Sequence, residues 1–326
     1  MAGLRTWRAP RMVEGPFQAR VEDIPALNEV FSDAFTERYR RDGMVGVRVP
    51  ALNPQIWRYA IDDAQDGAML WRGERGEVAA FNVAHRSGAE GWMGPLAVRP
   101  ELQGEGLGKD VVRAGIDWLR RREARTIGLE TMPRTMDNIG FYSALGFTPG
   151  RLTLTLTVDA APADHSGVLL GRLPARDRED ALAECRALTD RLQPGIDFTR
   201  ELALTEELAL GDTVLLWGND GALAAFALCH SVPLVEGRVR EELRVLKLAM
   251  ADPATLPALM RAVADFARRS GTRRAAVRVQ GVYERMYREL VTLRGRVRWS
   301  DLRMTLDGYP EAPVAEGGVV LSNWEI

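Results

Sequence analysis

The 326-residue sequence has only two cysteines and three histidines, and no apolar run approaches the ~18 residues that would cross a membrane. Cys185 and Cys229 have no C-x-x-C spacing, which argues against a disulfide scaffold and a structural zinc site. The histidines (His85, His165 and His230) stand far apart without H-x-x-x-H spacing. We therefore expect no metal cofactor and no membrane-spanning segment.

An excess of charge of one sign is also missing. Lys and Arg number 43 and Asp and Glu 45, which gives a net charge of −2. This balance argues against nucleic acid or an anionic membrane as partner. Only Lys109 and Lys247 are lysines, and the other basic residues are arginines. We attribute this bias to the composition of a GC-rich bacterial source and not to a binding site. The first 20 residues are charged and lack the apolar stretch of a signal peptide, so we expect a cytoplasmic protein.

The composition and length indicate a folded chain of two domains. Hydrophobic residues make up 46% and charged residues 27%, and roughly 150 residues per domain is usual. Segment 76–85 shares its Gly, two Ala, Phe and His with segment 221–230, and segment 117–121 resembles 265–269. Two matches in the same order indicate a duplication.

Each half predicts a mixture of strands and helices, hence an α/β (α+β) fold. In the first half we expect helices from near Asp23 and at 111–122 and 137–145, and strands at 68–72, 77–85, 92–99, 126–132 and 152–158. The second half repeats this order from 167 to 308. The stretch 159–164 is rich in small residues and proline, so we place the domains at 1–158 and 159–326. Val319–Leu321 could add an edge strand.

A glycine-rich turn at 103–109 separates the strand 92–99 from the helix that follows. Glycines 104, 106 and 108 allow the backbone to approach a ligand, and the helix N-terminus adds a positive dipole. These features suit a pyrophosphate, although a flexible loop has the same composition. A P-loop is excluded because Gln103 replaces its first glycine and Asp110 follows Lys109; the dinucleotide fingerprint is excluded because its third glycine comes one residue early.

Two motifs in the first half resemble the GCN5-related N-acetyltransferase (GNAT) superfamily. Gln103, Gly106 and Gly108, after Val98-Arg99-Pro100, are similar to its acetyl-CoA signature, and segment 138–147 is similar to its second motif. Together with the order of the strands, these motifs extend the resemblance over nearly all of residues 15–158. The second half resembles a degenerate copy, so the chain resembles the tandem two-domain type. The resemblance implies two GNAT-like domains, each with a mixed, splayed central sheet flanked by helices.

The resemblance also implies acetyl-CoA as co-substrate, without a metal. Backbone groups at 96–98 would pair with the pantetheine arm, those at 104–109 would hold the pyrophosphate, and one N–H near Val98 would stabilise the oxyanion. The expected binding residues are Leu96, Ala97, Val98, Gln103, Gly104, Glu105, Gly106, Leu107, Gly108, Lys109 and Asn138. The family's usual asparagine position holds Thr135, so either Thr135 or Asn138 would contact CoA.

The catalytic candidates are Tyr142 and Glu130. The family often places a general acid at the position of Tyr142, and a protonated phenol can donate to the departing thiolate; the alternative is a tyrosine packed in the core. Glu130 would be the base or the anchor of a water relay, unless it only hydrogen-bonds a neighbouring loop. Trp92 stands where some relatives carry a glutamate, which leaves Glu90 as a second base candidate. His85 matches His230 in the repeat, so we expect a structural role for it.

The second half lacks these features. Glu130, Asn138 and Tyr142 align with Arg278, Met286 and Leu290, and segment 251–257 has no glycine. We expect this half not to bind CoA but to support the first, to wall the substrate cleft or to form a subunit interface. Lys247 and Arg278 are expected to be solvated surface charges, with an acidic substrate as the alternative.

These observations predict an acetyl-CoA-dependent N-acetyltransferase in which a primary amine attacks directly within a ternary complex. The amine would belong to a small molecule or a peptide, and segment 38–59 would shape its pocket, with Tyr39, Val45, Val47, Asn53 and Trp57 as candidates. The alternative is a non-catalytic acyl-CoA-binding module with a regulatory or scaffolding role. Whether the chain forms a homodimer stays open.

Overall fold

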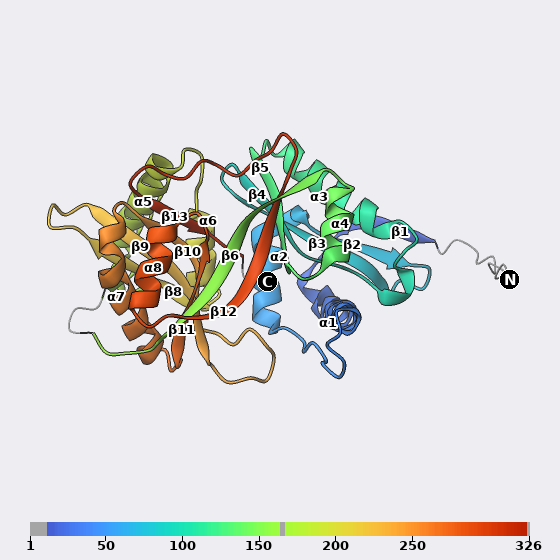
Figure 1. The fold of residues 1–326 in the computed structure, drawn as a ribbon, viewed down its shortest axis with the longest axis horizontal. Coiled ribbons are helices and arrows are strands. Elements are labelled where there is room, and N and C mark those ends of the chain that lie inside the picture. Colours follow the sequence, from blue (N-terminus) through green and yellow to red (C-terminus); the bar gives the residue numbers. More distant parts are fainter. Residues whose placement is uncertain (1–11, 164–166, 325–326) are drawn as a thin grey trace.

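A single mixed sheet runs through both halves of the chain in the computed structural model, which describes residues 12–163 and 167–324 (Figure 1). The first eleven residues, on which the expectation of no signal peptide partly rests, and His165 lie outside the described residues. None of the described helices combines the length and the apolar character that a membrane crossing requires.

The strands are β1 (Val13–Gln18), β2 (Ala68–Gly73), β3 (Val78–Ser87), β4 (Glu90–Val98), β5 (Thr126–Thr131), β6 (Phe147–Asp159), β7 (Val168–Leu169), β8 (Gly211–Trp217), β9 (Leu223–His230), β10 (Glu242–Met250), β11 (Arg274–Gln280), β12 (Arg296–Leu306) and β13 (Val319–Ser322). The α-helices are α1 (Ile24–Arg41), α2 (Pro54–Ala64), α3 (Leu107–Arg121), α4 (Met136–Ser143), α5 (Ala175–Leu192), α6 (Thr199–Glu207), α7 (Leu256–Arg269) and α8 (Glu284–Thr292).

Helices cover both faces of the sheet in each half. Helices α1 and α2 pack on one face of β2–β4 and helices α3 and α4 on the other, and in the second half α5 and α6 lie opposite α7 and α8. Helix α1 begins with Pro25 in its first turn, where a missing N–H costs nothing, and buries the apolar stripe that includes Leu27, Val30 and Phe31. The predicted α/β fold with flanking helices is confirmed.

Strands β4 and β5 separate partway along their length. They pair in parallel from Glu90 to Met93, opposite Thr126–Leu129, and no pairing with β5 continues beyond Met93. Residues 96–98 keep β3 as their partner. Backbone N–H and C=O groups on the other edge of this segment therefore face the opening between β4 and β5 and can bind an extended ligand. This opening is the splay expected of the first half.

The second half has the same fork, but its own chain fills it. Strand β10 pairs with β11 from Glu242 to Val245, and β13 then pairs antiparallel with residues 247–250 of β10. In the repeat, residues 248–250 correspond to 96–98. Asn323 joins both arms of the fork, because its N–H donates to Leu246 and its side chain to the carbonyl of Arg278. The strand expected near Val319–Leu321 thus exists, but it lies in the fork rather than at the sheet edge.

Strand β12 joins the two halves, because it inserts between β5 and β6 (Figure 1). It pairs with β5 through residues 302–305 and with β6 along most of its length, while β6 pairs on its other side with β11. The division proposed at residue 158 therefore separates strands that belong to one continuous sheet. Residues of β12 reach the region of β5 in the first half.

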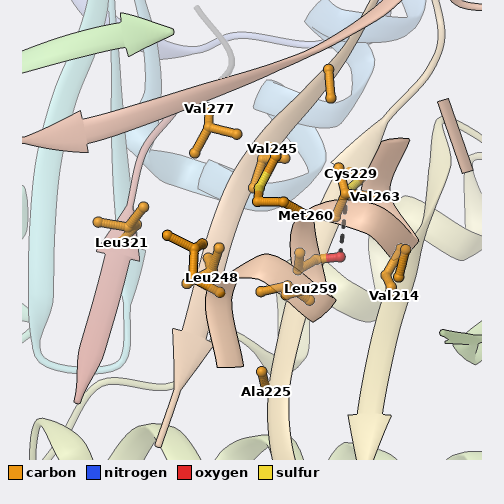
Figure 2. Close-up of a cluster of buried hydrophobic side chains, with 14 of the residues drawn as sticks. Val214, Ala225, Cys229, Val245, Leu248, Leu259, Met260, Val263, Val277 and Leu321 are labelled. Atoms are coloured by element: carbon orange, nitrogen blue, oxygen red, sulfur yellow. Dashed lines mark hydrogen bonds between the residues drawn. The ribbon is translucent and has the colours of Figure 1, made fainter. Parts of the chain in front are cut away.

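The second half has a dense apolar core beneath α7 (Figure 2). Leu248 from β10 and Leu259 from α7 are fully buried there, together with Cys229. Cys185 is buried on α5, in a second apolar cluster of this half. Both thiols are free.

The expectation that Lys247 is a solvated charge is wrong. Its side chain is 0% exposed, and its Nζ lies 3.7 Å from the Glu201 carboxylate and donates to the hydroxyls of Ser87 and Ser322. Its ammonium also lies 3.6 Å from the centre of the Trp324 ring. Such a desolvated cation needs these partners. The hydrogen bonds of Lys247 therefore link β10 to β3 and to β13.

Candidate active site

Two cavities of about 430 Å³ each meet beside β4. The first lies between the glycine turn, the end of β4 and α1. The second lies where the two halves face each other. Phe35 and Leu96 line both, so a ligand in the first cavity can reach the second along this part of β4.

The glycine turn has the conformation that its sequence requires. Gly104 and Gly106 have φ angles of +85° and +97°, which favour glycine, and a Cβ at either position would meet no atom within 4 Å. The Gln103 side chain donates to the carbonyl of Val98 (2.9 Å) and ties the turn to the end of β4. Helix α3 begins at Leu107, and Gly108 and Lys109 in its first turn line the first cavity, where unpaired helix N–H groups can bind an anion.

Most of the predicted binding residues line the first cavity. They are Leu96, Ala97, Val98, Gln103, Gly104, Gly106, Gly108 and Lys109. Glu105 and Leu107 do not line it. The Asn138 side chain donates instead to the hydroxyl of Thr131 (3.5 Å), and Thr135 donates to Asp42 (3.0 Å). The two alternatives for the asparagine position therefore both lie away from this cavity.

Helix α1 supplies a wall that the sequence did not reveal. Ala34, Phe35 and Arg38 line the first cavity opposite the glycine turn. The guanidinium of Arg38 is paired with Asp42 (2.6 Å) and Asp137 (3.1 Å). Segment 38–59 was expected at the acceptor pocket, but Arg38 lines the first cavity, and the sequence did not indicate Ala34 or Phe35 there.

The first cavity fits an acyl-CoA. The unpaired edge at 96–98 offers N–H and C=O groups to an extended pantetheine arm, and the turn and helix N-terminus suit a pyrophosphate. Lys109 adds a positive charge at the cavity wall. The corresponding edge of the second half, at 248–250, is covered by β13.

The second cavity takes its walls from both halves. From the first half come Tyr39, Trp92, Glu130 and Tyr142. From the second half come Leu234, Glu242, Arg244, Val245, Leu246, Ala276, Arg278, Trp299, Asp301 and Trp324. The sequence left open whether the second half walls the substrate cleft; in the structure this half lines the second cavity.

Tyr142 stands on α4 at the wall of the second cavity. Its side chain is buried against Phe141 and Phe147, and burial raises the pKa of its phenol well above the usual range. Within the described part of the chain, its hydroxyl has no hydrogen-bond partner. Tyr142 is therefore a protonated donor at neutral pH, and it also packs in the core as the alternative reading proposed.

Glu130 is held by several donors. It accepts from Arg278 and from the hydroxyl of Thr153 (3.0 Å), and Arg303 lies 3.7 Å away. Burial acts to raise the pKa of this carboxyl, but the charges of Arg278 and Arg303 outweigh it and hold the pKa below its usual value. The carboxylate thus stays ionised and takes up a proton less readily than an ordinary glutamate.

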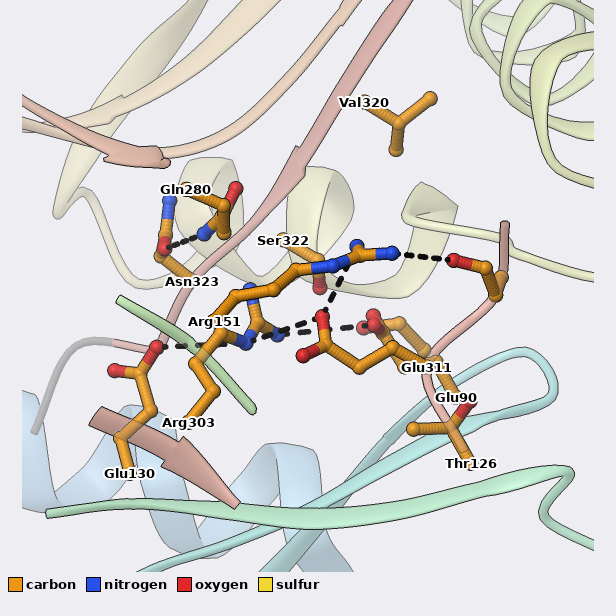
Figure 3. Close-up of polar contacts among 12 residues, drawn as sticks. Glu90, Thr126, Glu130, Arg151, Gln280, Arg303, Glu311, Val320, Ser322 and Asn323 are labelled. Carbon is orange, nitrogen blue, oxygen red and sulfur yellow. Dashed lines mark hydrogen bonds and ion pairs between the residues drawn. The ribbon is translucent and has the colours of Figure 1, made fainter. Parts of the chain in front are cut away.

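Glu90, the second base candidate, and His85 do not line the second cavity. Glu90 is buried beside Arg303, at 3.9 Å, in a cluster with Glu311 (Figure 3). The two ring nitrogens of His85 lie within hydrogen-bond distance of Asp63 (3.2 Å) and of the Gly94 carbonyl (3.0 Å), and the ring stacks on Trp324. This packing agrees with the structural role expected for His85.

Of the residues expected to shape the acceptor pocket, Tyr39 lines the second cavity. Val45 and Val47 are exposed, and Asn53 caps the N-terminus of α2. Trp57 is fully buried and donates to Asn28. Arg278, which was expected to be solvated, is instead half-buried between Glu130 and Asp301.

Comparison with known proteins supports this description. Residues 25–147 match the model of the acetyltransferase (GNAT) family. No curated protein matches the chain in sequence.

Solved structures share the fold over both halves. A GCN5-related N-acetyltransferase from Sphaerobacter thermophilus is 17% identical with a TM-score of 0.60, covering 94% of this chain and 98% of that one. A tandem GNAT protein from the clavulanic acid biosynthesis pathway is 12% identical with a TM-score of 0.61, covering 92% and 100%. N-myristoyltransferase from Saccharomyces cerevisiae, solved with myristoyl-CoA, is 11% identical with a TM-score of 0.64, covering 94% and 85%.

The family match in the first half, the fold shared over the whole length and the cavity that fits an acyl-CoA agree with one another. Residues 25–147 therefore form a domain that matches the GNAT family, and the chain as a whole shares the fold of a tandem GNAT structure.

Proposed function

We propose that the chain transfers an acetyl group from acetyl-CoA to a primary amine by direct attack in a ternary complex. The observation that supports this most strongly is the junction of the two cavities at Leu96 and Phe35. A thioester held along the open edge of β4 would reach the second cavity there, where the amine would meet it without a covalent enzyme intermediate.

The first half binds the donor in this proposal. Backbone groups of Leu96, Ala97 and Val98 pair with the pantetheine arm, and the N–H groups of the turn at 103–109 hold the pyrophosphate. An N–H near Val98 stabilises the charge that develops on the carbonyl oxygen. Asn138 acts through Thr131, which lines the second cavity, rather than by touching the donor.

Tyr142 and Glu130 divide the proton chemistry. Tyr142 donates a proton to the departing thiolate, because its buried phenol is protonated and faces the second cavity. Glu130 keeps its charge and anchors water or orients the ammonium of the acceptor, as its ion pairs with Arg278 and Arg303 favour. The second half walls the acceptor cavity and binds no CoA of its own.

A thiol-release assay with acetyl-CoA and a panel of primary amines, both small molecules and short peptides, tests the proposal. We expect saturable release that depends on an amine, with mass spectrometry detecting the acetylated product. Binding of acetyl-CoA without turnover on any amine would contradict it and support a non-catalytic acyl-CoA-binding module.

A further inference from the structure

Three carboxylates line the second cavity within the described residues: Glu130, Glu242 and Asp301. Glu242 lies at the start of β10 and accepts from Arg274 (2.7 Å). Asp301 comes from β12, the strand that the second half inserts beside β5. A comparison of the two repeats does not reveal Asp301. This residue reaches the second cavity because β12 pairs with β5 of the first half.

Asp301 is held by two donors. Its Oδ2 accepts from Arg278 (2.9 Å) and its Oδ1 accepts from the indole of Trp299 (3.0 Å). Its side chain is 16% exposed, and each oxygen keeps a lone pair for a further proton. The charged and titratable groups that face it are Arg278 on β11, Glu130 on β5 and the phenol of Tyr39 on α1.

The two carboxylates that share Arg278 differ in basicity. Burial raises the pKa of Asp301, and the negative charge of Glu130 adds to this against the opposing charge of Arg278. Glu130 has a lowered pKa, because Arg278, Arg303 and Thr153 all favour its charged form. The protein thus keeps one member of the pair ionised and leaves the other ready to accept a proton.

We propose that Asp301 is the catalytic base that removes the proton of an alkylammonium acceptor. This inference rests on the proposed transferase function. It also assigns the acceptor to amines that are charged at neutral pH, since these require a base before they attack.

An N–H proton of the ammonium passes to Asp301, directly or through one water, and the freed lone pair forms the C–N bond. The C–S bond breaks, and the thiolate takes the proton of Tyr142. The nitrogen then returns a second proton to Tyr142, and Asp301 releases its proton to water, so each turnover liberates one proton.

Two nucleophiles separate the role of Asp301 from the transferase function itself. 2-Phenylethylamine is an ammonium ion at neutral pH and carries an apolar body suited to the aromatic walls of the cavity. Hydroxylamine is uncharged at neutral pH and needs no base. We expect Asp301→Asn to lose on the order of 100-fold or more in kcat/KM with 2-phenylethylamine and less than about threefold with hydroxylamine.

The pH profile gives a second readout. The wild-type rate with 2-phenylethylamine should level off near neutral pH, whereas the Asp301→Asn rate should rise about tenfold per pH unit with the fraction of neutral amine. Asp301→Glu, which keeps a carboxylate, should restore much of the preference for the charged amine. Asp66→Asn, at an ion pair with Arg122 outside both cavities, is the matched control and should behave as wild type.

The losses of Asp301→Asn on the two nucleophiles show whether Asp301 acts as the base. Equal losses on both nucleophiles, or no loss with 2-phenylethylamine, would overturn the inference, since a structural defect would affect both reactions alike. Wild-type activity on hydroxylamine but not on 2-phenylethylamine would overturn it while leaving the transferase function intact. Acetyl transfer to neither would contradict the proposed function. A cooperative thermal unfolding transition and an acetyl-CoA affinity that matches wild type establish that Asp301→Asn is folded.

Discussion

Glu130 and Arg278 occupy equivalent positions in the two repeats and form an ion pair with each other. Glu130 stands on β5 and Arg278 on β11, with β12 and β6 between these strands in the sheet. The two repeats thus carry opposite charges at this position. The contact joins the two halves at the wall of the acceptor cavity.

The variant Glu130→Gln should lose stability in a pH-dependent way. Because the folded state lowers the pKa of Glu130, its charge stabilises the fold above the usual glutamate pKa of about 4.3 and this contribution disappears as the pH falls through the lowered value. We expect a loss of about 2 kcal/mol at pH 7. Urea unfolding of the wild-type protein and of the variant, between about pH 3 and about pH 7, measures this loss of unfolding free energy. A difference that grows on acidification would contradict the assignment.

Replacement of Tyr142 by phenylalanine should slow turnover by on the order of 100-fold, because the thiolate then leaves without a proton donor. The affinity for acetyl-CoA should change little, since Tyr142 lines the acceptor cavity and not the donor cavity. Steady-state kinetics and calorimetric titration separate the two effects. Unchanged turnover would remove Tyr142 from the mechanism.

Gly106→Ala should weaken acetyl-CoA binding at least about tenfold, because a side chain at its positive φ shifts the turn and the N-terminus of α3. Gly221 is a matched control: its φ is +78°, a Cβ there also meets open space, and it lies in a hairpin of the second half. Both variants should lose a similar stability of about 1–2 kcal/mol. Equal affinities for acetyl-CoA in the two variants would contradict the role of the glycine turn.

Leu321→Ala tests the strand that fills the second fork. Leu321 is fully buried on β13, opposite Leu248, so its truncation should cost about 2–5 kcal/mol of unfolding free energy. Chemical denaturation measures the loss. The variant should still bind acetyl-CoA at one site, because the second half has no glycine turn even when β13 is weakened. A second binding site in the variant would show that β13 alone blocks the second fork.

Much of the first half's secondary structure could be predicted from the sequence. Strict alternation and helical periodicity located β2 to β6, α3 and α4 within a few residues, because local burial patterns decide these elements. The glycine turn at 103–109 likewise marked one wall of the first cavity, since glycine at positive φ is a local requirement.

Partner choice between strands could not be predicted. The sequence identifies β12 and β13 as strands, but periodicity does not say which edge a strand pairs with. The approach of Asp301 to the acceptor cavity and the burial of Lys247 both follow from those pairings. The expectation that Lys247 and Arg278 are solvated was wrong for this reason: their charges are satisfied by residues that are distant in the sequence.

The number and position of acetyl-CoA sites show most directly whether the first half alone binds the donor. Calorimetric titration together with a crystal structure of the complex should give one molecule per chain, with its pantetheine arm along Leu96–Val98 and its pyrophosphate at the turn 103–109. Two molecules per chain, or a single one along 248–250 in the second half, would contradict the account.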